Sequence, residues 1–248
     1  NDALFGEAGI QLGLITRDDV EFAISSQFNY SVILNGQSRI AQNIVAAYEP
    51  HGLQAEALRA LRTQLLMRWL ENQVTTKTLA VVSADRGEGR SFLAANLAVV
   101  FSQLGHSTLL IDADFRNPQQ HLYFDLTNRQ GLSTLLQGKG DSSPIRSIDE
   151  LRNLNVLPSG PPPPNPQELL SHARFSVTLA QLAQRFDIVI LDTPAAAKYA
   201  DANAVSMRAG AALTVARQGH TSVTDMKQIR DDLQRIGANV LGSVLLNF

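Results

Sequence analysis

The sequence contains no cysteine among its 248 residues. Disulfides, thiolate metal sites and cysteine nucleophiles are therefore excluded. An excess of one charge is also missing, because the net charge is -2 and the pI is about 6.2. A chain so close to neutral has no general attraction to nucleic acid or to anionic lipid, and we expect neither as a direct partner.

Long hydrophobic runs are absent as well. No apolar stretch approaches the ~20 residues of a membrane-spanning helix, which predicts a cytoplasmic protein without direct membrane insertion. The five histidines are scattered, and no Gly-x-Ser-x-Gly elbow occurs. The spacing therefore supports neither a zinc site nor a serine hydrolase.

What the chain does contain is a regular alternation of apolar runs and segments with helical periodicity. At 44% hydrophobic residues, this length suits one large α/β domain with a small appendage. Strands separated by helices imply parallel crossovers, so we expect a mostly parallel sheet with helices on both faces. The expected strands are one that begins at Leu79 and those at 108–115, 154–157, 187–192, 211–216 and 239–246. The expected helices are 53–70, 92–104, 131–136, 174–186, 200–208 and 221–236.

Residues 1–50 differ in character and predict a small helical N-terminal module. A short amphipathic helix is expected after Thr16, which is a good N-cap residue, with Asp18 and Asp19 in its first turn. A second short helix is expected over 40–48 and ends before Pro50. We place the domain boundary at residue 50, with the main domain over 51–248.

The stretch 79–92, LAVVSADRGEGRSF, joins an apolar strand to a helix through two glycines. Such a loop turns backbone N–H groups inward in front of a helix N-terminus and favours a phosphate chain. The strict P-loop pattern G-x-x-x-x-G-K-[ST] is met only by Gly89 and Ser91, because Ala84 replaces its first glycine and Arg90 its lysine. Taken alone, the stretch is equally compatible with a glycine-rich turn that binds no nucleotide.

Two further strands end in aspartate. TLLIDADF at 108–115 carries Asp112 and Asp114, and DIVILDTP at 187–194 carries Asp192. In an open parallel sheet, ligands bind beyond the carboxyl ends of the strands, so these carboxylates are expected beside the glycine loop. Together with the hydroxyl of Ser91 they form a set that suits Mg²⁺, which favours nucleotide binding over the plain turn.

The helix expected over 53–70 carries Glu56, Arg59 and Arg62 at every third position. Such spacing is typical of a solvated helix face with i,i+3 ion pairs. The alternative is a self-complementary contact between subunits, in which an acid and two arginines on one rigid edge pair with a neighbouring copy.

Four separated motifs together resemble the bacterial tyrosine kinases, and more closely the EpsG-type chain-length-determinant tyrosine kinases of exopolysaccharide biosynthesis. The motifs are SADRGEGRS at 83–91, LLIDADFRNP at 109–118, VLPSGPPPPNPQELL at 156–170 and VILDTP at 189–194. The resemblance covers residues 50–248 and reaches more weakly into the N-terminal module. It implies a P-loop kinase domain related to the MinD/ParA-like ATPases, with ATP/ADP and Mg²⁺ as cofactors.

The resemblance also implies roles for individual residues. Asp112 and Asp192 would hold the metal together with Ser91, and Asp114 would accept or position the proton of the tyrosine hydroxyl. Arg90, Asp112 and Asp114 form the implied catalytic set, and Glu56, Arg59 and Arg62 match an element through which such kinases assemble into rings. The implied nucleotide-binding residues are Arg86, Gly87, Glu88, Gly89, Arg90, Ser91, Phe92 and Asn247, the last of them beside adenine.

The partner implied by the resemblance is a membrane-embedded polysaccharide chain-length regulator, which would hold the kinase at the inner face of the cell membrane. One departure matters: Arg90 stands where the family has lysine, and the wide guanidinium is not equivalent to a compact ammonium. Two alternatives therefore stay open, a MinD/ParA-like ATPase switch without tyrosine transfer and a nucleotide-binding scaffold weakened by Arg90.

Overall fold

The computed structural model describes residues 5–16, 19, 20, 23, 33, 36, 38–70, 77–139 and 143–247. Its centre is a seven-stranded sheet in the order β3-β4-β2-β5-β1-β6-β7. Only the pair β3–β4 is antiparallel. The strands are β1 (Thr78–Ser83), β2 (Thr108–Asp112), β3 (Arg146–Ser147), β4 (Leu154–Leu157), β5 (Ile188–Asp192), β6 (Ala211–Arg217) and β7 (Asn239–Leu246). The α/β class and the mostly parallel sheet are confirmed.

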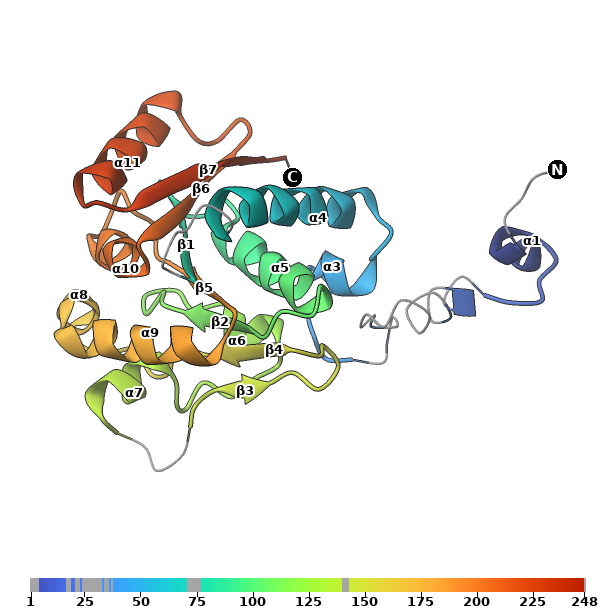
Figure 1. Cartoon of the computed structure of the whole chain (residues 1–248), viewed down its shortest axis with the longest axis horizontal. Helices are drawn as coiled ribbons and strands as arrows, with labels where there is room; N and C mark the ends of the chain where they lie inside the picture. The colour runs from blue at the N-terminus through green and yellow to red at the C-terminus, as the bar shows by residue number, and fades with distance from the viewer. Residues whose placement is uncertain are drawn as a thin grey trace.

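Helices cover both faces of this sheet (Figure 1). One face packs against α3 (Val45–Tyr48), α4 (Leu53–Leu65) and α5 (Arg90–Gln103). The other face packs against α7 (Leu132–Gln137), α8 (Pro166–Ser171), α9 (Ala173–Arg185), α10 (Asp201–Ala209) and α11 (Val223–Arg235). Because both faces are covered, β1, β2 and β5 are buried along their whole length, which explains why each reads as an apolar run.

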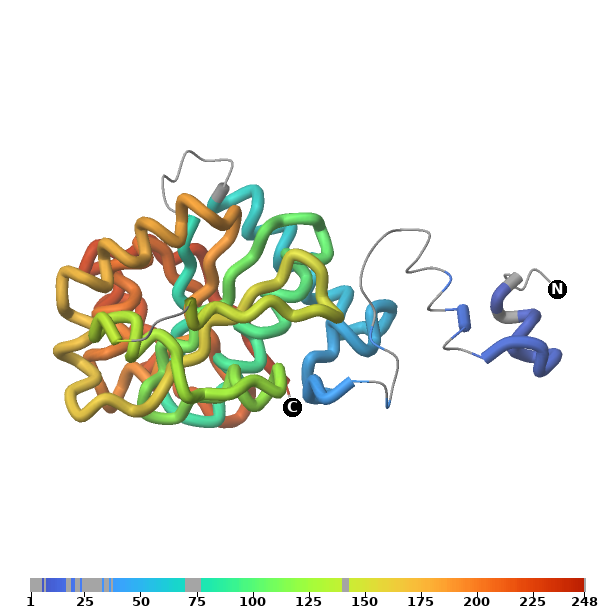
Figure 2. Tube along the Cα trace, turned by 90° about the horizontal axis from the view of Figure 1, so that it is seen from below, coloured from blue at the N-terminus to red at the C-terminus, as the bar shows by residue number. Residues whose placement is uncertain are grey.

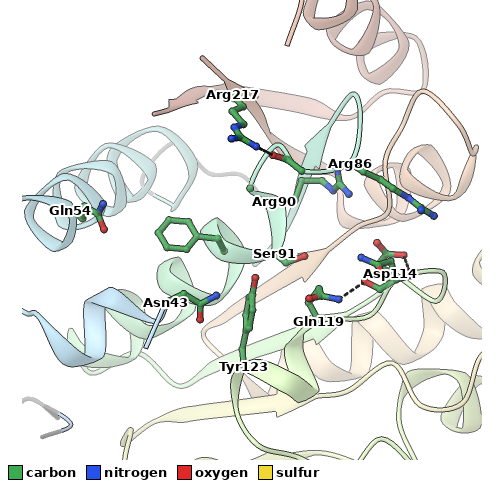
Figure 3. A pocket seen from close by; sticks show the side chains of 13 residues that line it. Asn43, Gln54, Arg86, Arg90, Ser91, Asp114, Gln119, Tyr123 and Arg217 are labelled. Carbon is green, nitrogen blue, oxygen red and sulfur yellow. Dashed lines mark hydrogen bonds between the residues drawn. The ribbon is translucent and has the colours of Figure 1, made fainter. Parts of the chain in front are cut away.

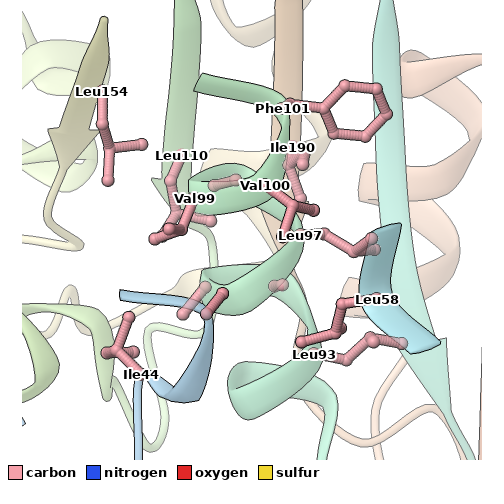
Figure 4. Close-up of a cluster of buried hydrophobic side chains, with 14 of the residues drawn as sticks. Ile44, Leu58, Leu93, Leu97, Val99, Val100, Phe101, Leu110, Leu154 and Ile190 are labelled. Carbon is pink, nitrogen blue, oxygen red and sulfur yellow. The ribbon is translucent and has the colours of Figure 1, made fainter. Parts of the chain in front are cut away.

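Helix α5 is the centre of the first core. Its sequence is apolar on nearly every side, and eleven of its residues are buried, from Arg90 to Ser102. Figure 4 shows Leu97, Val100 and Phe101 of α5 between the sheet and its neighbours. A helix so fully enclosed has a fixed position, and its N-terminus is therefore held firmly at the carboxyl end of β1.

The helix predicted over 53–70 is present but changes character before its end. Its last five residues form the π-helical segment η1 (Leu66–Leu70). Trp69, the single tryptophan of the chain, is fully buried there. None of the helices in the described part of the chain is long and apolar enough to cross a membrane.

Some short elements were not predicted, and one strand is shorter than expected. The strand expected over 108–115 ends at Asp112, because the Asp112 carboxylate accepts a hydrogen bond from the backbone N–H of Asp114 at 3.2 Å and turns the chain. The four-residue helix α6 (Gln120–Tyr123) and the two-residue strand β3 follow in parts of the sequence without clear periodicity.

The N-terminal module is described only in part. Helix α1 (Phe5–Gln11) lies apart from the sheet domain in both views (Figures 1 and 2). The predicted N-cap is formed, since the hydroxyl of Thr16 accepts from the N–H of Asp19 at 3.1 Å, but most of the helix expected after it lies outside the described residues.

The segment 40–48 packs with the sheet domain. Ile44 and Ala46 belong to the same core as α5, and the buried Asn96 of α5 accepts from the N–H of Ala46 and donates to the carbonyl of Asn43, both at 3.0 Å. The helix expected over 40–48 shortens to α3. The domain boundary at residue 50 stays a prediction, although these contacts join the residues just before it to α5.

Candidate active site

The glycine loop lies between β1 and α5 and borders a cavity of about 530 Å³. Gly87 and Gly89 have φ angles of 75° and 88°, a left-handed backbone that glycine adopts without a Cβ clash. This conformation lets the loop turn into α5, whose first residues Ser91 and Phe92 line the cavity. One wall of the cavity is therefore formed by the loop and by the N-terminus of α5, a helix of fourteen residues. Backbone N–H groups at such a position are what a phosphate-binding site requires.

Arg90 lies beneath the loop rather than extended across the cavity. Its Nε donates to the carbonyl of Thr193 at 2.9 Å, and its Nη1 donates to the hydroxyl of Ser83 at 2.5 Å and to the carbonyl of Asp85 at 2.6 Å. The residue is 7% exposed and still lines the cavity. Within the described residues nothing accepts a hydrogen bond from Nη2, so this nitrogen is the one available to a phosphate oxygen.

Glu88 has a different place from its neighbours in the loop. Its carboxylate is buried and accepts from the N–H of Asp85 and from the hydroxyl of Thr221. The side chain therefore holds the loop to the segment after β6 and does not line the cavity. Only the backbone of Glu88 is available for the nucleotide contact that the sequence resemblance implied.

Asp112 and Asp192 lie side by side at the ends of adjacent strands. They are register partners in the β2–β5 pair, and both are fully buried. Asp112 Oδ2 accepts from the backbone N–H groups of Gln119 and Gln120, each at 3.0 Å. Asp192 Oδ2 accepts from Gln120 Nε2 at 2.8 Å, whereas its Oδ1 is buried and has no hydrogen-bond partner among the described residues.

Burial dominates the electrostatics of this pair. It raises the pKa of Asp192 to about 6, against the opposing effect of contacts with Ser91 and Gln120. The pKa of Asp112 is raised well above its usual range, first by burial and then by the charge of Asp192. Ionising two buried carboxylic acids costs free energy when no positive charge is near them, and more so when one oxygen has no hydrogen-bond partner. A bound divalent cation would offset this cost.

The residues therefore suit a magnesium site. The described part of the chain has no group of three or more histidine, aspartate or glutamate side chains placed to hold a metal ion by themselves. Two carboxylates and the Ser91 hydroxyl are nevertheless the usual protein share of an Mg²⁺ shell that water and phosphate oxygens complete. The orphaned Asp192 Oδ1 is the atom that such a hydrated ion would satisfy.

Asp114 follows β2 and lines the same cavity (Figure 3). It is 4% exposed, and its Oδ1 accepts from the backbone N–H groups of Arg116 at 3.0 Å and Asn117 at 2.9 Å. These two bonds fix the carboxylate. Its second oxygen accepts no described hydrogen bond and is available to a ligand in the cavity.

Comparisons with known proteins identify the family of this chain. The sequence profile of the family described as "Cellulose biosynthesis protein BcsQ" matches residues 76–241. Tyrosine-protein kinase YwqD of Bacillus subtilis is 36% identical over 211 residues, which cover 85% of this chain and 88% of the relative. The chain belongs to the bacterial tyrosine-protein kinases.

Solved structures agree with this assignment. The kinase domain of Escherichia coli tyrosine kinase ETK has a TM-score of 0.77 and 29% identity, and the match covers 90% of this chain and 92% of that domain. The chimerical protein CapA2B2 also has a TM-score of 0.77, with 31% identity over 94% of this chain and 98% of that chain. The kinase therefore has the P-loop fold that its sequence predicted.

Several cavity residues of this kinase were missed by sequence reasoning. Tyr123 of α6 points toward Ser91 (Figure 3), and its pKa is raised by burial and by the charge of Asp192 while it hydrogen-bonds Asn43. Arg217, at the end of β6, donates to the carbonyl of Gly87 at 3.1 Å. Neither position has a sequence signal, because each is brought to the site by long-range packing. Other cavity residues missed in this way are Asn43, Gln54, Asn117 and Gln119.

Arg116 of the kinase is turned away from the cavity. Its Nε donates to the buried Asp201 at 2.6 Å, and its guanidinium carbon lies 3.7 Å from the ring centroid of Tyr199. Arg116 does not line the cavity, although it lies only two residues after Asp114. The structure instead assigns it to holding the loop that follows β5.

The remaining predicted residues of the kinase lie elsewhere. Asn247 lines a second cavity of about 470 Å³ between α4 and β7, which shares Gln54 and Phe92 with the first. Glu56, Arg59 and Arg62 lie on α4. Arg59 donates to Glu56 and to the carbonyl of Pro50, and Arg62 Nη1 donates to the carbonyl of Val100 at 2.7 Å.

Proposed function

We propose that the phosphoryl donor of this protein-tyrosine kinase is ATP, bound with Mg²⁺ in the cavity at the carboxyl ends of β1, β2 and β5. The observation that carries the proposal is the buried pair Asp112 and Asp192 beside the N-terminus of α5. The loop from Arg86 to Phe92 would receive the phosphates. Ser91, Asp112 and Asp192 would hold Mg²⁺, which neutralises charge on the β- and γ-phosphates when bound.

In the proposed reaction, Asp114 accepts the proton of the acceptor tyrosine. The tyrosine oxygen forms a bond to the γ-phosphorus as the bond from that phosphorus to the bridging oxygen breaks, and the electron pair of the broken bond leaves with ADP. Two backbone N–H groups hold Asp114 Oδ1, which leaves Oδ2 to receive the proton. The loop amides and Arg90 Nη2 would stabilise the transferred group, so Arg90, Asp112 and Asp114 form the proposed catalytic set.

The second cavity is the proposed site of the base. It shares Phe92 with the cavity beside the phosphate loop and is lined mainly by apolar side chains of α4 and β7, together with Asn247. Its amides are those of Gln54, Gln64 and Asn247, and a mainly apolar slot with a few amides suits an adenine ring. We therefore keep Asn247 as the proposed adenine contact.

The proposed cellular role is control of exopolysaccharide chain length, polymerisation or export. The matched family description names cellulose biosynthesis, which supports a role with polysaccharide. The proposed partner is a membrane-embedded chain-length regulator that recruits the kinase to the cytoplasmic face of the membrane. Glu56, Arg59 and Arg62 would join copies of the kinase into a ring.

The kinase names of the relatives favour tyrosine transfer over a MinD/ParA-like switch or an inactive scaffold. One experiment separates the three: incubation with γ-labelled ATP and Mg²⁺, followed by analysis of the labelled products. Phosphotyrosine is the expected product. Labelled inorganic phosphate alone would favour the switch, and bound but unconverted nucleotide whose turnover returns in Arg90→Lys would favour the scaffold.

A further inference from the structure

We propose that Gln120 is a positioning residue that holds both metal-binding carboxylates of this kinase in register with the phosphate loop. The inference rests on the proposed Mg²⁺ site and adds a residue that no motif in the sequence marked. Gln120 is fully buried at the start of α6, and it contacts all three elements of that site.

The backbone of Gln120 acts on Asp112. Its N–H donates to Asp112 Oδ2 at 3.0 Å, next to the N–H of Gln119 at the same distance. Asp112 Oδ1 accepts from the N–H of Asp114 at 3.2 Å. The Asp112 carboxylate is therefore held on both oxygens by the turn between β2 and α6, and its orientation is fixed.

The side chain of Gln120 acts on Asp192 and Ser91. Its Nε2 donates to Asp192 Oδ2 at 2.8 Å and to the backbone carbonyl of Ser91 at 3.2 Å. Both partners are acceptors, so the amide nitrogen, not the amide oxygen, must face them. The two N–H bonds of one amide thus tie the end of β5 to the first turn of α5.

This arrangement decides which oxygen of Asp192 is left for the metal. Because Gln120 occupies Oδ2, the buried Oδ1 is the oxygen without a described partner. A carboxylate fixed in this way presents one defined oxygen to the water shell of Mg²⁺. Loss of such an orienting hydrogen bond typically costs about 10- to 100-fold in metal affinity.

The test uses Gln120→Met, which keeps the length of the side chain and removes both donors. Gln228→Met is the matched control, because Gln228 lies exposed on α11 and its side chain donates to Asp232, far from the proposed metal site. The fluorescent nucleotide mant-ADP is titrated into each protein in EDTA and at increasing Mg²⁺. In Gln120→Met we expect unchanged affinity in EDTA and a Mg²⁺ requirement raised about 10-fold or more.

Each alternative outcome has a definite meaning. Equal weakening of mant-ADP binding with and without Mg²⁺ would mean a merely structural role and overturn the inference, as would a normal Mg²⁺ requirement. Absence of mant-ADP binding in the wild type would instead refute the proposed nucleotide site. Gln120→Glu, which keeps the shape but sets a carboxylate against Asp192, is the second variant and should show the same raised requirement.

A measurement on the wild type needs no variant. The ¹⁵N-labelled side-chain amide of Gln120 should change its chemical shift when Mg²⁺ is added to the ADP-bound kinase, whereas the amide of Gln228 should not. An unchanged Gln120 signal at saturating Mg²⁺ would contradict the inference.

Discussion

Arg90 occupies the lysine position of the P-loop pattern, and its hydrogen bonds also hold the loop to the ends of two strands. Three of them join the end of β1, the loop and the end of β5 through one guanidinium. A lysine has a single nitrogen and cannot reach all three acceptors in the same geometry. Arginine at this position therefore braces the loop, and in the proposed site its remaining nitrogen, Nη2, would be available to phosphate.

The first prediction concerns this brace. Arg90→Lys should lower the free energy of unfolding of the nucleotide-free kinase by about 1–3 kcal/mol, because buried acceptors lose their donors. Chemical denaturation followed by the fluorescence of Trp69, the only tryptophan, measures the change. Arg86→Lys is the control at an exposed loop position and should be neutral. A fully stable Arg90→Lys would show that the three hydrogen bonds contribute nothing.

Asp192 carries the second prediction. Its ionised form is disfavoured by burial, so Asp192→Asn should stabilise the kinase at pH 8 without Mg²⁺ by roughly 1–3 kcal/mol. The folded pKa of about 6 is raised above the unfolded value, so the wild type gains stability as it takes up a proton below pH 6. The advantage of the variant should therefore shrink toward pH 5.

The control for this pH series is Asp231→Asn, because the Asp231 side chain is 50% exposed. It should leave the unfolding midpoint nearly unchanged at both pH values. A less stable Asp192→Asn at pH 8 would mean that the ionised carboxylate is well accommodated without a metal, which would contradict the proposed magnesium site.

At the scale of elements, the loop after β4 meets the start of α7 at very close range. The N–H of Leu132 donates to the carbonyl of Pro158 at 2.7 Å, and that of Ser133 donates to the carbonyl of Ser159 at 2.8 Å. A Cβ on Gly131 would lie 2.2 Å from both Gly160 N and the Pro158 carbonyl oxygen. Only glycine allows these two backbones to approach so closely.

The third prediction follows from this contact. Gly131→Ala should destabilise the kinase by about 3 kcal/mol or more, because backbone atoms cannot move aside as a flexible side chain would. Gly105→Ala, at a φ of 96° with no atom within 4 Å of the added Cβ, should cost only about 1 kcal/mol. Thermal unfolding of the two variants compares them, and equal losses would refute the close approach.

The strands and helices differ in how well the sequence predicted them. Strands β5 and β7 were placed within a residue because both are apolar runs of strand length, and Asp112 and Asp192 were found because they end such runs. Helix α6 has only four residues and no period to detect. The direction of Arg90 toward Thr193, 103 residues later in the chain, is fixed by tertiary packing and has no local signal.

At the scale of the whole molecule, the proposed ring depends on α4. Arg59 and Arg62 already bond carbonyl groups of their own chain, whereas the side chain of Glu56 is 64% exposed. Of Glu56, Arg59 and Arg62, Glu56 is therefore the residue most available for contact with a neighbouring copy in a ring. Its replacement tests assembly without removing the internal hydrogen bonds of Arg62.

The fourth prediction is that Glu56→Lys shifts the kinase toward monomer in sedimentation velocity, since reversed charge repels arginines of the neighbouring copy. Asp231→Lys reverses an exposed charge on α11 and should keep the wild-type distribution. The same mass distribution for Glu56→Lys and the wild type would argue against the ring contact on α4.

We propose that the cavity beside α5 transfers phosphoryl groups to tyrosine with Asp114 as the proton acceptor. The most direct measurement is the rate of phosphotyrosine formation from γ-labelled ATP in the wild type and in Asp114→Asn, with mant-ADP affinity measured in parallel. We expect phosphotyrosine in the wild type, a rate about 10²- to 10⁴-fold lower in Asp114→Asn, and equal nucleotide affinity in the two proteins. Wild-type rates in Asp114→Asn, or no phosphotyrosine from the wild type with its membrane partner present, would contradict the proposal.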